Sequence, residues 1–345
     1  MTDRKLATIR KIAEVKAIPD ADKICAYRTD GWWVVDQIGK YQVGDRVIYC
    51  EVDSFIPHHL APFLSKGKEP HEFDGTWGER LRTIKLKGQL SQGLLLPLTT
   101  LTDEAGHGVV PADDILIEVG TDVADWLGIL KYEKPVPVQL AGLIRGNFPP
   151  EIPKTDQERI QNLTKEFAEL QQYKWAVTEK INGCSATYFL DNTGDFHVCS
   201  RNLDLKPDES NIYWKIAIQS DIENKMRSLG LEGHALQGEI IGEGIQGNQY
   251  KYKPCFNLFD IYKVGEGYLP LGAVHSLADT LDVRTVPLLD TEFSLTQYTV
   301  EDLLTYANGK SKLNTSQREG VVFQCLEYPE KSFKVVSDEW LLENE

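Results

Sequence analysis

The stretch WAVTEKING, residues 175–183, decides how the chain is interpreted. Residues 175–179 are rich in types that favour strands, and Asn182-Gly183 is typical of a turn. Lys180 therefore stands at a strand-to-turn junction, from which its side chain can project into a pocket. Lysine is a nucleophile only as the neutral amine, so such a site needs nearby cations or desolvation. Taken alone, the string is more typical of a solvated hairpin turn.

Further short strings follow along the chain, and together with the first they favour a functional site over a solvated turn. They are Ser200-Arg201-Asn202, Gly238-Glu239 ahead of a glycine-rich segment at 242–248, Phe259-Asp260-Ile261, Glu319-Gly320-Val321-Val322, and Lys334 within Ser332–Val336. Short strands carry most of them, at 186–190, 197–200, 234–241, 256–262, 320–325 and 331–336, and a helix is expected at 212–228. The pattern predicts an α+β domain with mainly antiparallel strands.

In order and spacing, these strings resemble the motifs of the covalent nucleotidyltransferases, which include ATP-dependent ligases and mRNA capping enzymes. The resemblance is nearest to the RNA ligases. Lys180-Ile181-Asn182-Gly183 is similar to motif I, Arg201 lies in motif Ia, Glu239 in motif III, Phe259 in motif IIIa, Glu319 in motif IV and Lys334 in motif V. The resemblance implies an ATP-grasp-like ligase domain that uses ATP and Mg²⁺ or Mn²⁺.

The resemblance also implies a role for each residue. Lys180 would attack the α-phosphorus of ATP and form a lysyl-AMP phosphoramidate. Phe259 and Val322 would cover the two faces of adenine. Glu319 would bind the metal ion, and Lys334 would meet the α-phosphate. The remaining nucleotide contacts would come from Glu179, through its side chain or backbone, and from Asn182, Gly183, Arg201, Glu239 and Arg159, the last at the leaving pyrophosphate.

Two positions depart from the family pattern. Asn182 stands where most members have aspartate, and Val336 replaces a second basic residue of motif V. Asparagine keeps one acceptor but loses the charge. We expect slower adenylation with an unchanged reaction class.

The first part of the chain has a different pattern. Short strands are expected at 7–15, 24–28, 32–38, 45–52, 81–86 and 93–96, with no long amphipathic helix among them, which is typical of a small β-barrel of the OB-fold type. The strings at 18–23, 43–45 and 88–93 resemble the N-terminal OB module of a ligase family. We therefore expect an OB-like nucleic-acid-binding domain at 1–130.

The distribution of charged residues along the chain supports different roles for the two parts. The chain has a net charge of −15, yet residues 1–100 hold 15 basic and 13 acidic side chains, and the remainder holds 22 and 39. The basic side chains cluster at Arg80, Arg82, Lys85 and Lys87, where we expect contact with nucleic acid. A solvated strand face is the alternative for this cluster.

Five prolines at 131–154 predict an extended linker. A helix is then expected from Thr155, with Thr155 and Glu158 at capping-box spacing and a catalytic domain over 155–345. The six cysteines form no CxxC pair and are expected to be reduced. With neither a transmembrane stretch nor a secretion signal apparent, we expect no membrane partner and a cytoplasmic, nucleoid or nuclear location.

The function expected from this resemblance is ATP-dependent RNA ligation. The enzyme would seal 3′-OH/5′-phosphate breaks, at nicks in duplexes with RNA on the 3′-OH side, and would act as a monomer. Three alternatives stay open: a DNA ligase, a capping-type guanylyltransferase, and a catalytically weakened nucleic-acid-binding relative.

Overall fold

The computed structural model describes residues 4–101, 117–133 and 142–344, which pack into two units. One unit contains residues 2–134 with 161–165 and 341–345, and is called the barrel unit here. The other contains residues 135–160 and 166–340, and is called the ligase unit. The chain thus leaves the ligase unit after Ile160, contributes five residues to the barrel unit, and returns.

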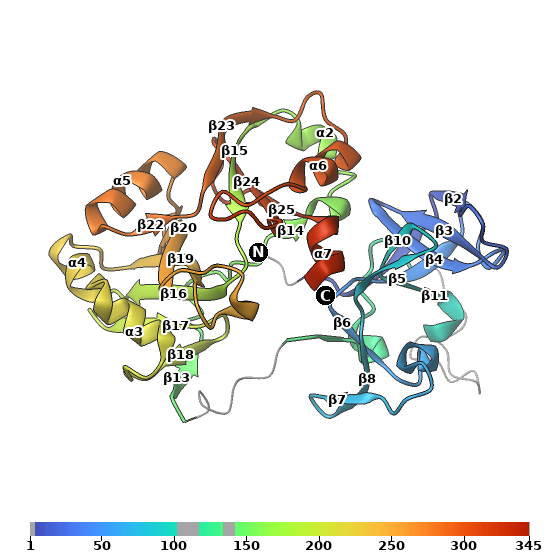
Figure 1. Ribbon diagram of the computed structural model, residues 1–345, viewed down its shortest axis with the longest axis horizontal. Helices are drawn as coiled ribbons and strands as arrows, with labels where there is room; N and C mark the ends of the chain where they lie inside the picture. The colour runs from blue at the N-terminus through green and yellow to red at the C-terminus, as the bar shows by residue number, and fades with distance from the viewer. Residues whose placement is uncertain (1–3, 102–116, 134–141, 345) are drawn as a thin grey trace. The chain divides into compact units, whose positions relative to one another are not determined.

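The barrel unit is built from short, mostly antiparallel strands, which Figure 1 draws in blue to green. Their hydrogen-bonded orders are β1-β5-β11, β2-β3-β4, β10-β9 and β12-β6-β8-β7. The bounds are β1 Ala7–Lys11, β2 Glu14–Ala17, β3 Ile24–Thr29, β4 Trp32–Gln37, β5 Arg46–Cys50, β6 Ser54–Pro57, β7 His71–Phe73, β8 Thr76–Arg80, β9 Thr83–Leu86, β10 Gln89–Gln92, β11 Leu94–Pro97 and β12 Leu130–Lys131. The expected small OB-like β-barrel is confirmed.

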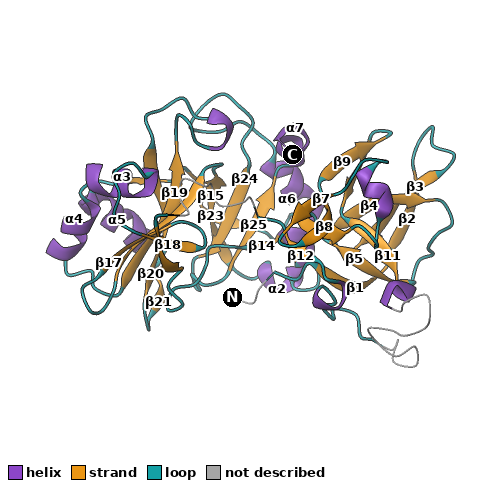
Figure 2. Cartoon of the chain, turned by 90° about the horizontal axis from the view of Figure 1, so that it is seen from below, coloured by secondary structure: helices purple, strands orange, loops and turns teal. Residues whose placement is uncertain are grey.

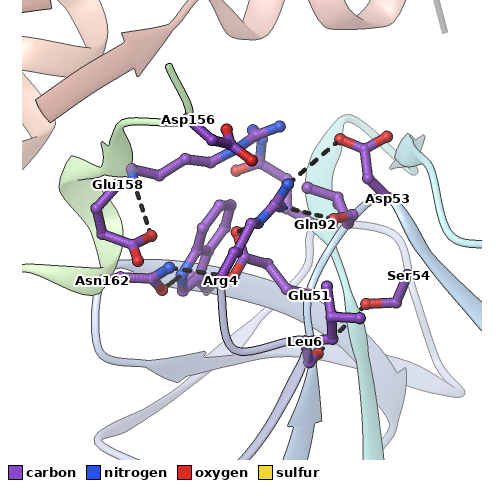
Figure 3. A network of polar contacts seen from close by, with 12 residues as sticks. Arg4, Leu6, Glu51, Asp53, Ser54, Gln92, Asp156, Glu158 and Asn162 are labelled. Atoms are coloured by element: carbon purple, nitrogen blue, oxygen red, sulfur yellow. Dashed lines mark hydrogen bonds and ion pairs between the residues drawn. The ribbon is translucent and has the colours of Figure 1, made fainter. Parts of the chain in front are cut away.

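Segment 161–165 is fastened to the barrel unit by Asn162. Its Oδ1 accepts hydrogen bonds from Arg10 and from the Trp32 indole, at 2.9 and 2.6 Å, and its Nδ2 donates to Glu51 Oε2 at 3.1 Å. Arg4 also pairs with Glu51, at 2.6 Å (Figure 3). The side-chain amide of Asn162 thus makes three hydrogen bonds to buried or partly buried polar groups of the barrel unit.

The ligase unit contains two sheets. The large sheet has the order β13-β18-β17-β16-β19-β20-β21, with β22 beside β20, and the small sheet has the order β14-β25-β24-β15-β23. Among the described residues, β14–β25 and β20–β22 are the parallel pairs. The mainly antiparallel α+β prediction is therefore confirmed.

The strand bounds of the large sheet are β13 Ile144–Asn147, β16 Cys184–Leu190, β17 Phe196–Cys199, β18 Leu203–Leu205, β19 His234–Ile241, β20 Cys255–Lys263, β21 Gly267–Tyr268 and β22 Arg284–Thr285. Those of the small sheet are β14 Glu158–Arg159, β15 Lys174–Lys180, β23 Leu288–Ser294, β24 Gly320–Cys325 and β25 Ser332–Val336. The helices are α2 Phe167–Leu170, α3 Ile212–Gln219, α4 Ile222–Ser228, α5 Leu271–Leu281, α6 Val300–Ala307 and α7 Asp338–Asn344.

Helices α3, α4 and α5 cover one face of the large sheet (Figures 1 and 2). Apolar side chains of these helices, among them Trp214, Met226 and Leu281, share one buried cluster with Tyr188 and Leu258 of the sheet. Leu236 and Ile240 of β19 belong to this cluster, so the alternating residues Gln237 and Glu239 lie on the other face of the sheet. The expected single helix at 212–228 is broken, because Asp221 takes a left-handed conformation with φ 53°.

The helix expected from Thr155 does not begin there, and helix α2 covers only Phe167–Leu170 of the predicted stretch. Glu158 and Arg159 form β14, parallel to Phe333 and Lys334 of β25, and the residues that follow make a short 3₁₀ turn at Ile160–Asn162. Pairing with a distant strand outweighs the local helical signal here. The expected linker also differs: residues 134–141 lie outside the described part, and Ile144–Asn147 is a strand that pairs with β18. The domain boundaries stay a prediction.

All six cysteines are free, in agreement with the expected reduced thiols. In the part of the chain that the structure describes, no helix has the length and apolarity needed to span a bilayer.

Candidate functional site

Lys180 ends β15 and lies beside the start of β24. The antiparallel register pairs Lys180 with Gly320, which places Glu319 just beyond the strand end. The Lys180 amine contacts Glu319 Oε1 at 2.5 Å, with 27% and 13% of the two side chains exposed. The predicted nucleophile and the predicted metal ligand are thus brought together from positions 139 residues apart.

Glu179 lies on the opposite face of the same strand, because neighbouring residues of a strand alternate in direction. Its carboxylate is 1% exposed and accepts hydrogen bonds from Ser311 Oγ and the Lys312 amide, at 2.5 and 2.7 Å. Both carboxylate oxygens therefore hold the 311–312 loop. Of the two roles expected for Glu179, the backbone route to adenine stays a prediction, and the side-chain route is disfavoured.

The turn after Lys180 is held by the segment that follows β19. The Asn182 side-chain amide donates to Gln249 Oε1 at 3.3 Å, and its backbone amide donates to Tyr250 Oη at 3.4 Å. Gln249 in turn donates to Ser316 Oγ and the Gln317 carbonyl. One glutamine thereby links the turn that bears the nucleophile to the loop that leads to Glu319.

Gly183 permits the close approach of this turn to β19. A Cβ at this position would lie 2.4 Å from the Ile240 carbonyl oxygen and 2.7 Å from Glu239 Cγ. Such distances are impossible for a real side chain without a backbone shift. The glycine is therefore needed for packing, independently of any contact with a nucleotide.

Glu239 lies on β19, opposite Ser185 of β16 and Asn257 of β20. Burial raises the pKa of its carboxyl group to about 8; the positive charges of Lys180 and Arg201 oppose this shift, and Glu319 adds to it. The predicted motif III glutamate is therefore close enough to Lys180, Arg201 and Glu319 to sense their charges. Perturbed carboxyl groups of this kind are common at active sites.

Phe259 and Val322 come from different sheets. Phe259 on β20 packs against a cluster that includes Ile181, Ile241 and Tyr250. Val322 on β24 lies between Thr178 and Lys334 on the neighbouring strands and is partly exposed. Phe259 thus packs beside the residue that follows the nucleophile, as a base platform requires, and the adenine sandwich itself stays a prediction.

A cavity of about 520 Å³ adjoins this apolar cluster. It shares Ile241, Tyr252 and Leu313 with the cluster and is also lined by Asn257, Asp279, Val283, Arg284 and Thr285. Sequence reasoning did not predict this cavity, because its lining residues belong to none of the motifs.

Lys334 and Arg201 both bind Asp156. Lys334 Nζ donates to Asp156 Oδ1 at 2.7 Å, and Arg201 donates to Oδ2 at 3.1 Å. Arg159 lies beside Lys334 in the β14–β25 pair and is 4% exposed. The structure thus brings together three predicted cations, along with Asp156, for which no role in the site was predicted.

The oxygen-donor side chains fit a hard divalent cation. Glu319 supplies a carboxylate, the type of ligand that Mg²⁺ prefers over nitrogen or sulfur. Within the described residues, no group of three or more His, Cys, Asp and Glu side chains is arranged to hold a metal ion. An ion bound at Glu319 would therefore complete its shell with substrate phosphates and water, as is usual for Mg²⁺.

The basic cluster of the barrel unit divides into two parts. Arg80 ends β8, pairs with Asp53 at 2.5 Å and lies over the Tyr132 ring, and it is therefore separate from the hairpin that carries the other three. Arg82, Lys85 and Lys87 are exposed on the β9–β10 hairpin, whose turn is Lys87-Gly88 with both φ angles positive. The hairpin is the more available part of the predicted nucleic-acid surface.

Sequence reasoning missed the residues that hold the site in place. These residues lie outside helices and strands, and their hydrogen-bond partners are distant in sequence; they are Asp156, Gln249, Ser311 and Lys312. No periodicity or motif marks such positions.

Known proteins match both units. Residues 6–98 match the family model of an OB-fold domain, and residues 173–336 match that of RNA ligase. No curated protein sequence matches the chain.

Solved structures extend the match to nearly the whole chain. The RNA ligase of Naegleria gruberi with PPi is 40% identical, with 98% of each chain covered and a TM-score of 0.87. A mutant of that ligase with ATP and Mn is 39% identical at the same coverage, with a TM-score of 0.85. Another mutant, with AMP and Mn, is 39% identical with a TM-score of 0.87. The chain therefore belongs to the RNA ligase family, as an enzyme whose ligase domain follows an N-terminal OB-fold domain.

Proposed function

We propose that this enzyme uses ATP and a divalent metal ion to adenylate Lys180 and then transfers the AMP to a nucleic-acid 5′-phosphate. The single observation that carries the proposal is the contact between Lys180 Nζ and Glu319 Oε1, at the junction of β15 and β24. The relatives with ATP or AMP and Mn support the choice of ligands.

In the first step, Lys180 Nζ bonds to the α-phosphorus as the bond from that phosphorus to the pyrophosphate oxygen breaks. The amine proton leaves to solvent, and Glu319 Oε1, the atom that Lys180 contacts, orients the amine towards the phosphorus. Lys334 stabilises the negative charge on the α-phosphate, Arg201 holds the sugar–phosphate region, and Arg159 binds the departing pyrophosphate. Glu319 would hold a divalent metal ion, which would supply charge neutralisation on the phosphates.

The base is held by Phe259 and Val322, and the backbone of Glu179 contributes to its recognition. Glu239 holds the ribose: its raised pKa favours the protonated carboxyl group, which donates one hydrogen bond to a ribose oxygen and can accept another from a ribose hydroxyl. Asn182 and Gly183 set the turn that presents the nucleophile.

We further propose that the substrate is a nicked duplex with RNA on the 3′-OH side. The enzyme would join the 3′-OH to the adenylylated 5′-phosphate and release AMP. Replacing the terminal 3′ ribonucleotide by a deoxyribonucleotide tests this: we expect a loss of sealing of tenfold or more. Equal sealing of both substrates would favour a DNA ligase.

The β9–β10 hairpin is the proposed nucleic-acid contact of the OB-fold domain. Residues 81–101 contain Arg82, Lys85 and Lys87 and no acidic side chain, so the local charge is favourable for a phosphate backbone. We propose that the enzyme acts as a monomer in the cytoplasm, the nucleoid or the nucleus.

A competition experiment between ATP and GTP distinguishes the proposed RNA ligase from a capping-type guanylyltransferase. A capping-type guanylyltransferase would form lysyl-GMP from GTP in preference to lysyl-AMP from ATP. A catalytically weakened binding protein would release no pyrophosphate from either nucleotide.

A further inference from the structure

Asp156 contacts two of the cations assigned above to the nucleotide phosphates. Its Oδ1 accepts from Lys334 Nζ at 2.7 Å, and its Oδ2 accepts from the Arg201 guanidinium at 3.1 Å. The two cations come from different sheets: Lys334 lies within β25 of the small sheet, and Arg201 follows β17 of the large sheet. One carboxylate therefore joins basic side chains that no strand pairing connects.

The backbone places Asp156 for this contact. The residue stands two positions before β14, which runs parallel to β25 with Arg159 opposite Lys334. This short pairing brings the 153–157 segment alongside the strand that carries Lys334. Thr155, the neighbouring residue, approaches Ser185 of β16 with its hydroxyl at 3.5 Å, so the segment touches both sheets.

Burial makes the contact with Lys334 more consequential than an ordinary surface ion pair. The Lys334 side chain is 10% exposed and the Asp156 side chain 23%, whereas Arg201 is 52% exposed. Partial burial weakens screening by water and fixes the side-chain conformations. Without the carboxylate, two positive charges directed at one place would repel and spread apart.

We infer that Asp156 is a positioning residue for adenylation, which holds Lys334 and Arg201 together in the arrangement that receives the phosphates of ATP. The inference rests on the proposed function. Preorganised charges stabilise a transition state without rearrangement at the moment of reaction, so fixing the two cations beforehand accelerates the step. Asp156 itself remains outside the group of residues that touch the reacting atoms.

The test is the rate of lysyl-AMP formation from ATP and Mg²⁺ in the full-length enzyme. Asp156→Asn keeps the side-chain size but removes the charge and turns one oxygen into a donor. We expect a tenfold or greater loss in maximal rate. Asp156→Glu, which restores the charge, should lie closer to the wild type than Asp156→Asn does. Glu223→Gln, which breaks the exposed pair with Arg227 on α4, is the matched control and should stay within twofold.

A double-mutant cycle distinguishes positioning from a general structural defect. In a Lys334→Ala background, Asp156→Asn should cost threefold or less, because one of the two cations that it positions is already gone. An equal loss in both backgrounds would overturn the inference. A faster Asp156→Asn enzyme would overturn it too, since the carboxylate would then compete with the phosphates. If the wild type forms no lysyl-AMP, the proposed function is wrong. If the wild type forms lysyl-AMP and Asp156→Asn forms it at the same rate, the proposed function stands and the inference about Asp156 is wrong.

Discussion

At the residue scale, Asn182 is the departure from the family pattern with the clearest structural consequence. Its side-chain amide donates to Gln249 Oε1, while Gln249 Nε2 is occupied by Ser316 and Gln317. An aspartate at position 182 would face the Gln249 oxygen and repel it. The Gln249 amide would then have to rotate and give up both of its present acceptors.

We predict that Asn182→Asp raises the rate of lysyl-AMP formation severalfold, because the restored charge can order a metal-bound water near Lys180. The same change should lower the free energy of unfolding by about 1 kcal/mol through the lost hydrogen bonds of Gln249. Single-turnover adenylation and urea denaturation measure the two effects. A slower Asn182→Asp enzyme would show that the turn is adapted to asparagine.

Asp260 gives a pH prediction at the same scale. Burial raises the pKa of its carboxyl group to about 7, partly opposed by the hydrogen bond from Gln324 at 2.7 Å. The native state therefore binds this proton more tightly than the unfolded chain does. Its contribution to stability is present at low pH and is lost as the pH rises from the ordinary aspartate range to about 7.

We predict that Asp260→Asn removes this loss. The free energy of unfolding of the variant should exceed that of the wild type by about 1–3 kcal/mol at pH 7.5, and the difference should shrink towards pH 4. Urea denaturation at several pH values measures it. A difference that does not change with pH would mean that Asp260 is not protonated in the native state.

At the element scale, the turn between β15 and β16 depends on a glycine for packing. A Cβ at Gly183 would collide with the Ile240 carbonyl oxygen. We predict that Gly183→Ala lowers the free energy of unfolding by about 2 kcal/mol or more and abolishes lysyl-AMP formation. Gly272→Ala on α5, where a Cβ meets nothing within 4 Å, should be neutral or slightly stabilising. Equal stability of the two variants would contradict this account of the turn.

The same scale shows what the sequence could predict and what it could not. The β15 strand and its Lys180 end were predictable, because strand-forming residues meet turn residues at Asn182-Gly183. The helix expected from Thr155 was wrong in its first turns because the Thr155–Glu158 spacing is local, whereas the pairing of Glu158 and Arg159 with β25 is not. The partner of Arg201 and Lys334 escaped prediction for the same reason: Asp156 is 178 residues away from Lys334.

At the scale of the whole molecule, the chain is negatively charged but the β9–β10 hairpin is basic. We therefore predict that changes in the hairpin affect sealing of the nucleic acid and not adenylation of the enzyme. Lys85→Ala with Lys87→Ala should reduce sealing of a nicked substrate by tenfold or more and leave lysyl-AMP formation within twofold. Sealing by the wild type should fall steeply between about 50 and 200 mM salt, because each phosphate contact releases counterions. Lys23→Ala, an exposed lysine on the same unit, is the control. If neither the double substitution nor added salt reduces sealing, the hairpin does not contact the nucleic acid.

The central claim is that the residues around Lys180 form a covalent AMP intermediate. Intact-protein mass spectrometry after incubation with ATP and Mg²⁺ tests it most directly, with the wild type beside Lys180→Ala. We predict that the wild type gains the mass of one AMP and that Lys180→Ala gains none. No gain by the wild type with ATP, or an equal gain by both proteins, would contradict the account.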